Sequence, residues 1–188
     1  MSELLHLAVP FSRDVAQSLK AGQKVLLSGV VYGARDQAHR RFAEALERGE
    51  GLPLDLSGQV IYYVGPTPAP PGRVCGAAGP TTSGRMDVYT PLLLSCGVRA
   101  LIGKGNRSPE VVAALKEFGA VYLAAPGGAG ALLSRCIKEM EVVAYPELGP
   151  EAVYRIVVDN FPVIVAIDAE GNNLYEFGPS SYRKKNSA

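Results

Sequence analysis

The segment from residue 36 to residue 48 (DQAHRRFAEALER) has a helical hydrophobic pattern. Ala38, Phe42, Ala45 and Leu46 fall on one face of a helix, and the charged residues fall on the others. This pattern is typical of an amphipathic helix whose apolar face packs against a core. The sequence therefore predicts a helix here.

Further helices are indicated by residues that favour a helix start. Ser12 and the pair Ser108 and Pro109 are typical of helix N-termini. Thr90 and Pro91 could cap and open another helix, although Pro91 could instead kink one that begins earlier. The predicted helices cover residues 12–20, 36–48, 90–96 and 108–118, with another that follows residues 127–130 and runs to about residue 137.

Short apolar runs rich in β-branched residues alternate with these helices. The predicted strands cover residues 24–30, 59–64, 99–103, 120–123 and 141–145. From Tyr154 onward, the runs YRIVVDNFP and VIVAID, a turn and then LYEF predict consecutive strands with a hairpin. Strands that alternate with helices, with extra strands late in the chain, predict an α/β fold with a mixed sheet.

One domain is expected over residues 1–179. The chain has 188 residues, and the 47% of them that are hydrophobic are enough to fill a single core. No linker-like or low-complexity stretch divides the chain. Residues 180–188 are polar and are expected to form a flexible tail.

The charge balance and the hydropathy argue against two classes of partner. Lys and Arg total 19 against 18 Asp and Glu, so the chain lacks the basic excess that favours binding to nucleic acid or an anionic membrane. The longest apolar runs fall far short of the ~20 residues that cross a bilayer, and the first residues do not have the pattern of a signal peptide. We therefore expect a cytoplasmic protein that binds neither nucleic acid nor a membrane.

The three cysteines, Cys75, Cys96 and Cys136, are widely separated along the chain. Their spacing matches neither a CxxC pair nor a metal-binding motif. We expect reduced thiols that pack as small apolar side chains, and no metal ligands from this chain.

Four short polar segments combine glycine or a helix start with a residue able to bind an oxyanion. They are residues 33–39 (GARDQAH), 79–87 (GPTTSGRMD), 103–107 (GKGNR) and 127–130 (GGAG). Each lies in a loop beside predicted strands and helices, where the binding sites of α/β folds gather. These segments are therefore the candidates for a site.

Segment 79–87 has the groups needed to hold a carboxylate. Thr81 and Thr82 supply hydroxyls, and Arg85 offers a planar guanidinium suited to a carboxylate. A structural alternative is a capped turn in which Arg85 pairs with Asp87 or another acid. Chemistry alone leaves these two interpretations almost level.

The other three segments also have structural alternatives. Arg35 precedes a helix with Asp36 at its expected cap, a common structural arrangement, and His39 would then be a surface helix residue. Lys104, between two glycines, is a candidate positive charge for a ligand, but the spacing of a phosphate-binding loop is absent. Residues 127–130 lack a dinucleotide-binding spacing and favour close packing at a helix start.

Together, RDQAH, YYVGP, GPTTSGRMD and IGKGN occur in an order that resembles the β subunit, or carboxy-terminal domain, of the iron–sulfur class I fumarases and L(+)-tartrate dehydratases. The resemblance extends from about Leu4 to Phe177. It implies a swivelling β/β/α domain in a hydro-lyase. It further implies a [4Fe–4S] cluster that is ligated by a partner α subunit and not by this chain, and an α2β2 assembly.

By the same resemblance, Arg35, Thr82, Arg85 and Lys104 are expected to contact the carboxylates of a small dicarboxylic acid, and Thr81 to lie where a proton leaves or joins carbon. Removing a proton beside a carboxylate builds negative charge there, and fixed cations stabilise that charge. Thr81 is a poor base unless a cation or a group from the other subunit assists it. Fumarate–malate and tartrate–oxaloacetate chemistry both fit the motifs, and a non-catalytic anion-binding module is an alternative of another class.

Overall fold

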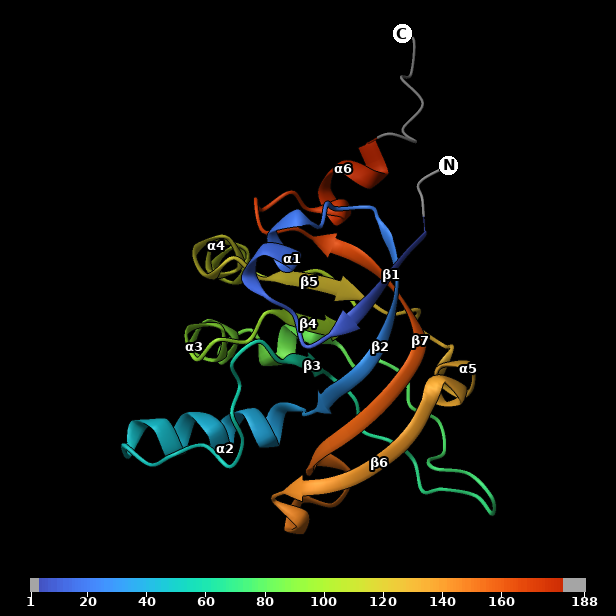
Figure 1. The fold of residues 1–188 in the computed structure, drawn as a ribbon. Helices are drawn as coiled ribbons and strands as arrows, with labels where there is room; N and C mark the ends of the chain where they lie inside the picture. The colour runs from blue at the N-terminus through green and yellow to red at the C-terminus, as the bar shows by residue number, and fades with distance from the viewer. Residues whose placement is uncertain (1–3, 181–188) are drawn as a thin grey trace, which may run out of the picture.

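Seven strands form one mixed sheet in residues 4–180, the part of the chain that the computed structural model describes (Figure 1). The strands are β1 (Leu4–Val9), β2 (Lys24–Gly33), β3 (Val60–Tyr62), β4 (Ala100–Gly103), β5 (Val121–Ala124), β6 (Ile137–Ala144) and β7 (Val153–Ile167). Their order is β1-β2-β3-β4-β5-β7-β6, and β2 also pairs with β7. A closed ring is therefore formed by five strands, β2, β3, β4, β5 and β7. The other two strands lie outside the ring, where β1 pairs with β2 and β6 pairs with β7.

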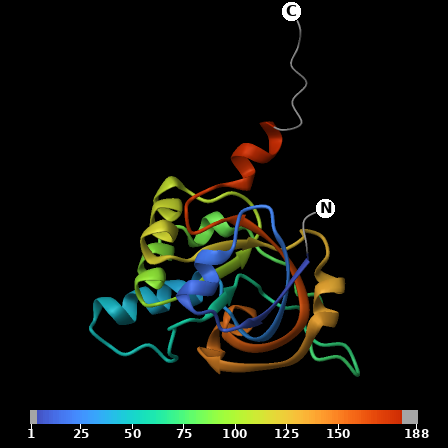
Figure 2. The same cartoon turned by 45° about the horizontal axis from the view of Figure 1, so that its top comes forward.

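Three of the helices cover one side of this ring. The helices are α1 (Arg13–Ser18), α2 (Asp36–Glu47), α3 (Thr90–Ser95), α4 (Pro109–Phe118), α5 (Gly130–Leu133) and α6 (Leu174–Ser180), with the 3-10 helices η1 (Ser83–Met86), η2 (Ser134–Cys136) and η3 (Pro146–Glu151). Figure 2 shows α2, α3 and α4 grouped on one side, with the curved strands beside them. Within residues 4–180, no helix is both long enough and apolar enough to cross a membrane.

Two apolar clusters form because successive residues of a strand face opposite ways. In β3, Val60 and Tyr62 belong to the cluster inside the ring, whereas Ile61 and the following Tyr63 belong to the cluster between the ring and the helices. Both faces of the strand are thus buried, which is why it reads as a continuous apolar run in the sequence. The predicted α/β fold with a mixed sheet is confirmed.

The predicted helix boundaries are most accurate where a local signal sets them. The Ser108 hydroxyl accepts the N–H of Val111 at the start of α4, and Gly119 ends the helix with a φ of 63°. Ser12 likewise caps α1 through its side chain. A side-chain cap and a left-handed glycine act within one turn of the helix, so the sequence alone is enough to place them.

The predicted hairpin after Tyr154 is wrong. The two runs form one strand, β7, which continues through Asn160 and pairs with β2 from Tyr154 to Ile164. After β7, the Asp168 carboxylate accepts the N–H groups of Glu170 and Asn172 and turns the chain. Residues LYEF then begin α6 and do not return as a strand.

Four further points differ from the prediction or remain open. The structure adds an edge strand, β1, that the sequence patterns did not predict. The helix expected up to residue 137 is only α5 followed by η2, because β6 already begins at Ile137. Ser180 belongs to α6, whereas residues 181–188 of the expected tail lie outside the described residues. The domain boundary at residue 179 stays a prediction.

Candidate functional site

Main-chain hydrogen bonds join segment 79–87 to the ends of β3 and β4. The N–H of Thr81 donates to the carbonyl of Tyr63 at 2.8 Å. On the other side, the N–H of Lys104 donates to the carbonyl of Thr81 at 3.3 Å, and the N–H of Ser83 donates to the carbonyl of Lys104 at 3.0 Å. Segments 79–87 and 103–107, far apart in the sequence, therefore lie side by side.

Glycines permit the close approach of these segments. A Cβ atom on Gly103 would lie 2.0 Å from Oγ of Ser83, and one on Gly130 would lie 3.0 Å from the main-chain nitrogen of Gly79. A Cβ on Gly127 would lie 3.7 Å from Cδ of Lys104. Segment 127–130 thus lies against both other loops. Close packing explains Gly130, whereas Gly128 meets no atom within 4 Å and has a φ of 76°.

Arg35 lies at the start of α2, where it is the N-cap residue, and its guanidinium is held on several sides. A Cβ on Gly65 would lie 2.5 Å from its Nη1, so the guanidinium would have to shift if residue 65 were not a glycine. Its Nη2 is 3.3 Å from the Glu151 carboxylate, and its Nε is 3.6 Å from that of Asp36. The side chain is 21% exposed, so one part of the guanidinium still reaches the surface.

Arg85 lies beside Thr81 and near the start of α2. One Nη2 N–H donates to the Thr81 hydroxyl, and Nη1 is 3.9 Å from the Asp36 carboxylate. Asp36 is therefore close to both Arg35 and Arg85, and segment 33–39 joins the same site. The structural alternative paired Arg85 with Asp87 or another acid. The pair with Asp87 is not formed, but Asp36 is such an acid, so both interpretations of segment 79–87 stay open.

The remaining two candidates, Thr82 and Lys104, are exposed and lie next to each other in a parallel bridge. Within residues 4–180, the Lys104 ammonium has no hydrogen-bond or ion-pair partner. Arg85 is also well exposed, at 47% of its side chain. The five candidates therefore lie around one surface that carries two partly engaged guanidinium groups, a free ammonium and two hydroxyls.

His39 is buried, not on the surface as expected. Its side chain is 0% exposed, and its Nδ1 lies 2.7 Å from the Arg35 carbonyl oxygen. Burial lowers the pKa of His39 from 6.5 to about 4, so the ring is neutral at physiological pH. The sequence carried one signal for this position, since His39 stands three residues before Phe42, within the apolar face of α2.

A buried ion pair that was not predicted joins segments 79–87 and 103–107. Nε of Arg107 donates to Oδ1 of Asp87 at 2.7 Å, and Oδ2 of Asp87 accepts the N–H of Ser108 at the start of α4. The Arg107 guanidinium also donates to the Thr90 hydroxyl and lies 4.9 Å from the centre of the Tyr122 ring. Asp87 thus has a structural role.

The described residues do not fit an iron–sulfur cluster. Within residues 4–180, no group of three or more His, Cys, Asp or Glu side chains is arranged to hold a metal ion. Cys75, Cys96 and Cys136 are free thiols, and burial raises the pKa of Cys75 and Cys136 above their ordinary values. A raised pKa disfavours the thiolate that binds iron.

This chain matches known proteins over most of its own length. The family model described as "Fumarase C-terminus" matches residues 3–178. Fumarate hydratase 2 of Leishmania major is 43% identical over 165 residues, which are 87% of this chain and 29% of that protein. The aerobic class I fumarate hydratase of Salmonella typhimurium is 43% identical over 155 residues, or 81% and 27%.

A shorter relative is matched over almost all of its length. The putative L(+)-tartrate dehydratase subunit beta of Methanocaldococcus jannaschii is 44% identical over 170 residues, which cover 87% of both chains. By contrast, this chain spans less than a third of each of the two fumarate hydratases. The chain belongs to the Fumarase C-terminus family, whose members among these relatives are hydro-lyases of the class I fumarase and tartrate dehydratase type.

Proposed function

We propose that this chain is the β subunit of a cytoplasmic hydro-lyase that reversibly hydrates fumarate to (S)-malate and is inactive without an α subunit. The observation that carries the proposal is the convergence of Arg35, Thr81, Thr82, Arg85 and Lys104 on one exposed surface. Cations and hydroxyls on one surface suit a small dianion. Membership in a family with hydro-lyase members supplies the reaction type.

Arg35, Thr82, Arg85 and Lys104 bind the two carboxylates of the substrate. The guanidinium groups donate paired hydrogen bonds to a planar carboxylate, and the Lys104 ammonium adds a compact charge. Because the reaction builds negative charge on the carboxylate beside the carbon that loses a proton, fixed cations stabilise the transition state more than the ground state.

Thr81 transfers the proton. Its hydroxyl accepts a hydrogen bond from Arg85, and a cation beside a hydroxyl favours the deprotonated form that a base requires. This contact supplies the cation without which a threonine is a poor base. A group from the α subunit is expected to complete the proton transfer, because Thr81 is only partly buried.

The partner α subunit carries a [4Fe–4S] cluster, and the assembly is an α2β2 heterotetramer. When bound to the partner, the cluster supplies a Lewis acid for the substrate hydroxyl. The residues of this chain bind and orient the carboxylates and move the proton.

The second candidate is the β subunit of an L(+)-tartrate dehydratase, which converts tartrate to oxaloacetate. The similarity to the Methanocaldococcus jannaschii protein favours it, because that match covers 87% of both chains. Tartrate is also a four-carbon dicarboxylate, so the same arginines and lysine suit it.

Co-expression with a candidate α subunit tests these proposals. The complex and this chain alone would be reconstituted with iron and sulfide without oxygen and assayed with fumarate and with L-tartrate. We expect turnover by the complex and none by the chain alone. Full activity of the chain alone would overturn the subunit proposal, and binding of fumarate without turnover of either acid would favour a non-catalytic anion-binding module.

A further inference from the structure

The imidazole of His39 contacts the main chain of Arg35. Its Nδ1 is 2.7 Å from the Arg35 carbonyl oxygen, and the His39 main-chain N–H donates to the same oxygen at 2.9 Å. A carbonyl oxygen only accepts hydrogen bonds, so Nδ1 carries the proton and Nε2 keeps its lone pair. One residue therefore makes two hydrogen bonds to the peptide group of Arg35.

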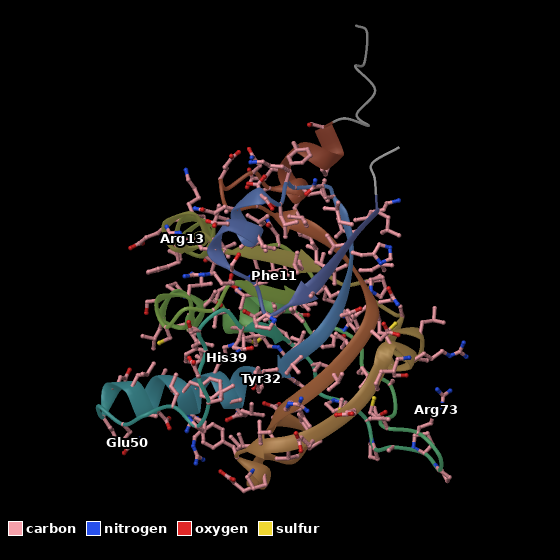
Figure 3. The ribbon with its side chains drawn as sticks, viewed as in Figure 1. Phe11, Arg13, Tyr32, His39, Glu50 and Arg73 are labelled. Carbon is pink, nitrogen blue, oxygen red and sulfur yellow. The ribbon has the colours of Figure 1, made fainter. Side chains whose placement is uncertain are left out.

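The same ring contacts the residue that supports Thr81. The rings of His39 and Tyr63 have centroids 5.3 Å apart and meet edge to face, and the Tyr63 carbonyl accepts the N–H of Thr81 at 2.8 Å. Figure 3 shows His39 at the end of α2 nearest the strands, far from Glu50 beyond the other end. The His39 ring thus contacts both the Arg35 carbonyl and Tyr63, the residue whose carbonyl holds the main chain of Thr81.

Packing of the ring alone does not account for a histidine here. Nε2 is fully buried and, within residues 4–180, has no hydrogen-bond partner. Burying a polar atom without a partner destabilises a protein, and a phenylalanine ring would contact Phe42, Tyr63 and Tyr89 without that cost. The Nδ1–H bond to Arg35 is what a phenylalanine could not provide.

We propose that His39 is a positioning residue, whose neutral imidazole holds the Arg35 peptide group and so directs the Arg35 guanidinium toward the substrate. The two hydrogen bonds fix the peptide plane from which the Arg35 side chain leaves, and Gly65 and Glu151 restrict the guanidinium farther out. This inference rests on the proposed function, because it assigns Arg35 to the substrate carboxylate.

Three substitutions in the α–β complex test the inference. His39→Phe keeps a ring and removes the donor, His39→Asn places an amide N–H near the position of Nδ1, and His39→Gln places it near Nε2. We expect kcat/KM to fall about tenfold for His39→Phe and His39→Gln, as for the loss of one hydrogen bond, and to stay within about threefold of wild type for His39→Asn. Circular dichroism would verify folding, and His39→Gln provides the test if His39→Phe does not fold.

Recovery of kcat/KM by His39→Asn distinguishes a positioning role of His39 from a packing role. A merely structural histidine would leave kcat/KM unchanged in the folded His39→Phe variant, or would make His39→Asn as poor as His39→Phe, and either result would overturn the inference. Nitrogen-15 NMR of the full chain would show Nδ1 protonated and Nε2 unprotonated, whereas the reverse tautomer would also overturn it.

Failure of this inference can be told apart from failure of the proposed function. Turnover by the wild-type complex with unaffected variants overturns the role of His39 alone. If the wild-type complex turns over neither fumarate nor L-tartrate, the dissociation constant of succinate, measured by calorimetry, replaces kcat/KM. We then expect succinate to bind about tenfold more weakly to His39→Phe and His39→Gln, and within about threefold of wild type to His39→Asn. A wild-type complex that neither turns over these acids nor binds succinate overturns both proposals.

Discussion

Arg107 and Asp87 form an ion pair with their Nε and Oδ1 atoms 2.7 Å apart, and the Arg107 side chain is fully buried. Asp87 ends the segment that carries Thr81 and Arg85, and Arg107 ends the segment that carries Lys104. The two loops that present the substrate-binding candidates are therefore fastened to each other below the surface.

Asp87→Ala is expected to destabilise the protein, because it leaves the Arg107 charge buried without its partner. Removal of one member of a buried pair costs about 3–5 kcal/mol, which urea unfolding of the chain would measure. The matched control is Glu50→Ala, which breaks the exposed pair with Arg48 and should leave the unfolding midpoint unchanged. An equal effect of the two substitutions would contradict the structural role of Asp87.

Arg85→Ala is expected to lower kcat/KM of the α–β complex by a factor on the order of 100 or more, because it removes a charged hydrogen-bonding contact. It also removes the cation next to the Thr81 hydroxyl. Arg73→Ala is the matched control, since Arg73 lies on the far side of the molecule from His39 (Figure 3). Kinetics of Arg85→Ala near those of the control would show that Arg85 does not bind substrate.

Gly103→Ala is expected to destabilise the chain by at least about 1–3 kcal/mol, the usual range for overpacking. Its Cβ would lie 2.0 Å from Oγ of Ser83, which in turn is hydrogen-bonded to the Tyr122 hydroxyl. Gly51→Ala is the control, because a Cβ there would meet no atom within 4 Å. Thermal unfolding of both variants would measure the difference, and an unchanged midpoint for Gly103→Ala would be inconsistent with this packing.

The stability of the chain is expected to fall as pH decreases from about 6.5 toward 4. Burial lowers the pKa of His39 to about 4, so in this range the unfolded chain binds a proton that the folded chain does not. The free energy of unfolding should be about 2 kcal/mol lower at pH 5 than at pH 7.5 from this group alone. Urea unfolding of wild type and His39→Phe at both values isolates this contribution, and an identical pH dependence in the two proteins would mean that His39 titrates normally.

Local signals in the sequence were sufficient for several elements of the fold. The boundaries of α4 follow from Ser108 and Gly119, each of which acts on its own helix. The continuity of β7 depends instead on its pairing with β2, more than a hundred positions away in the sequence. The α/β fold was thus predictable, whereas the path of its last strand was not.

The candidate site shows the same division. Thr81, Thr82, Arg85 and Lys104 were identified because each stands in a short segment with a recognisable composition, and their substrate roles stay predictions. The pairing of Arg107 with Asp87 was not predictable, because no spacing rule connects residues twenty positions apart in two loops. Including His39 in the apolar face of α2 would have predicted that its side chain is buried. It would not have predicted the contact of His39 with the Arg35 carbonyl.

The closed ring of five strands leaves β6 as an exposed edge, and this determines where copies of the isolated chain could aggregate. Val142 and Val143 on β6 are 46% and 40% exposed, a feature that favours pairing with a strand of another molecule. Lys138, Glu139 and Glu141 share that strand and are exposed as well, and charged side chains discourage such pairing. These three charges are therefore expected to oppose pairing of β6 with a second copy of the chain.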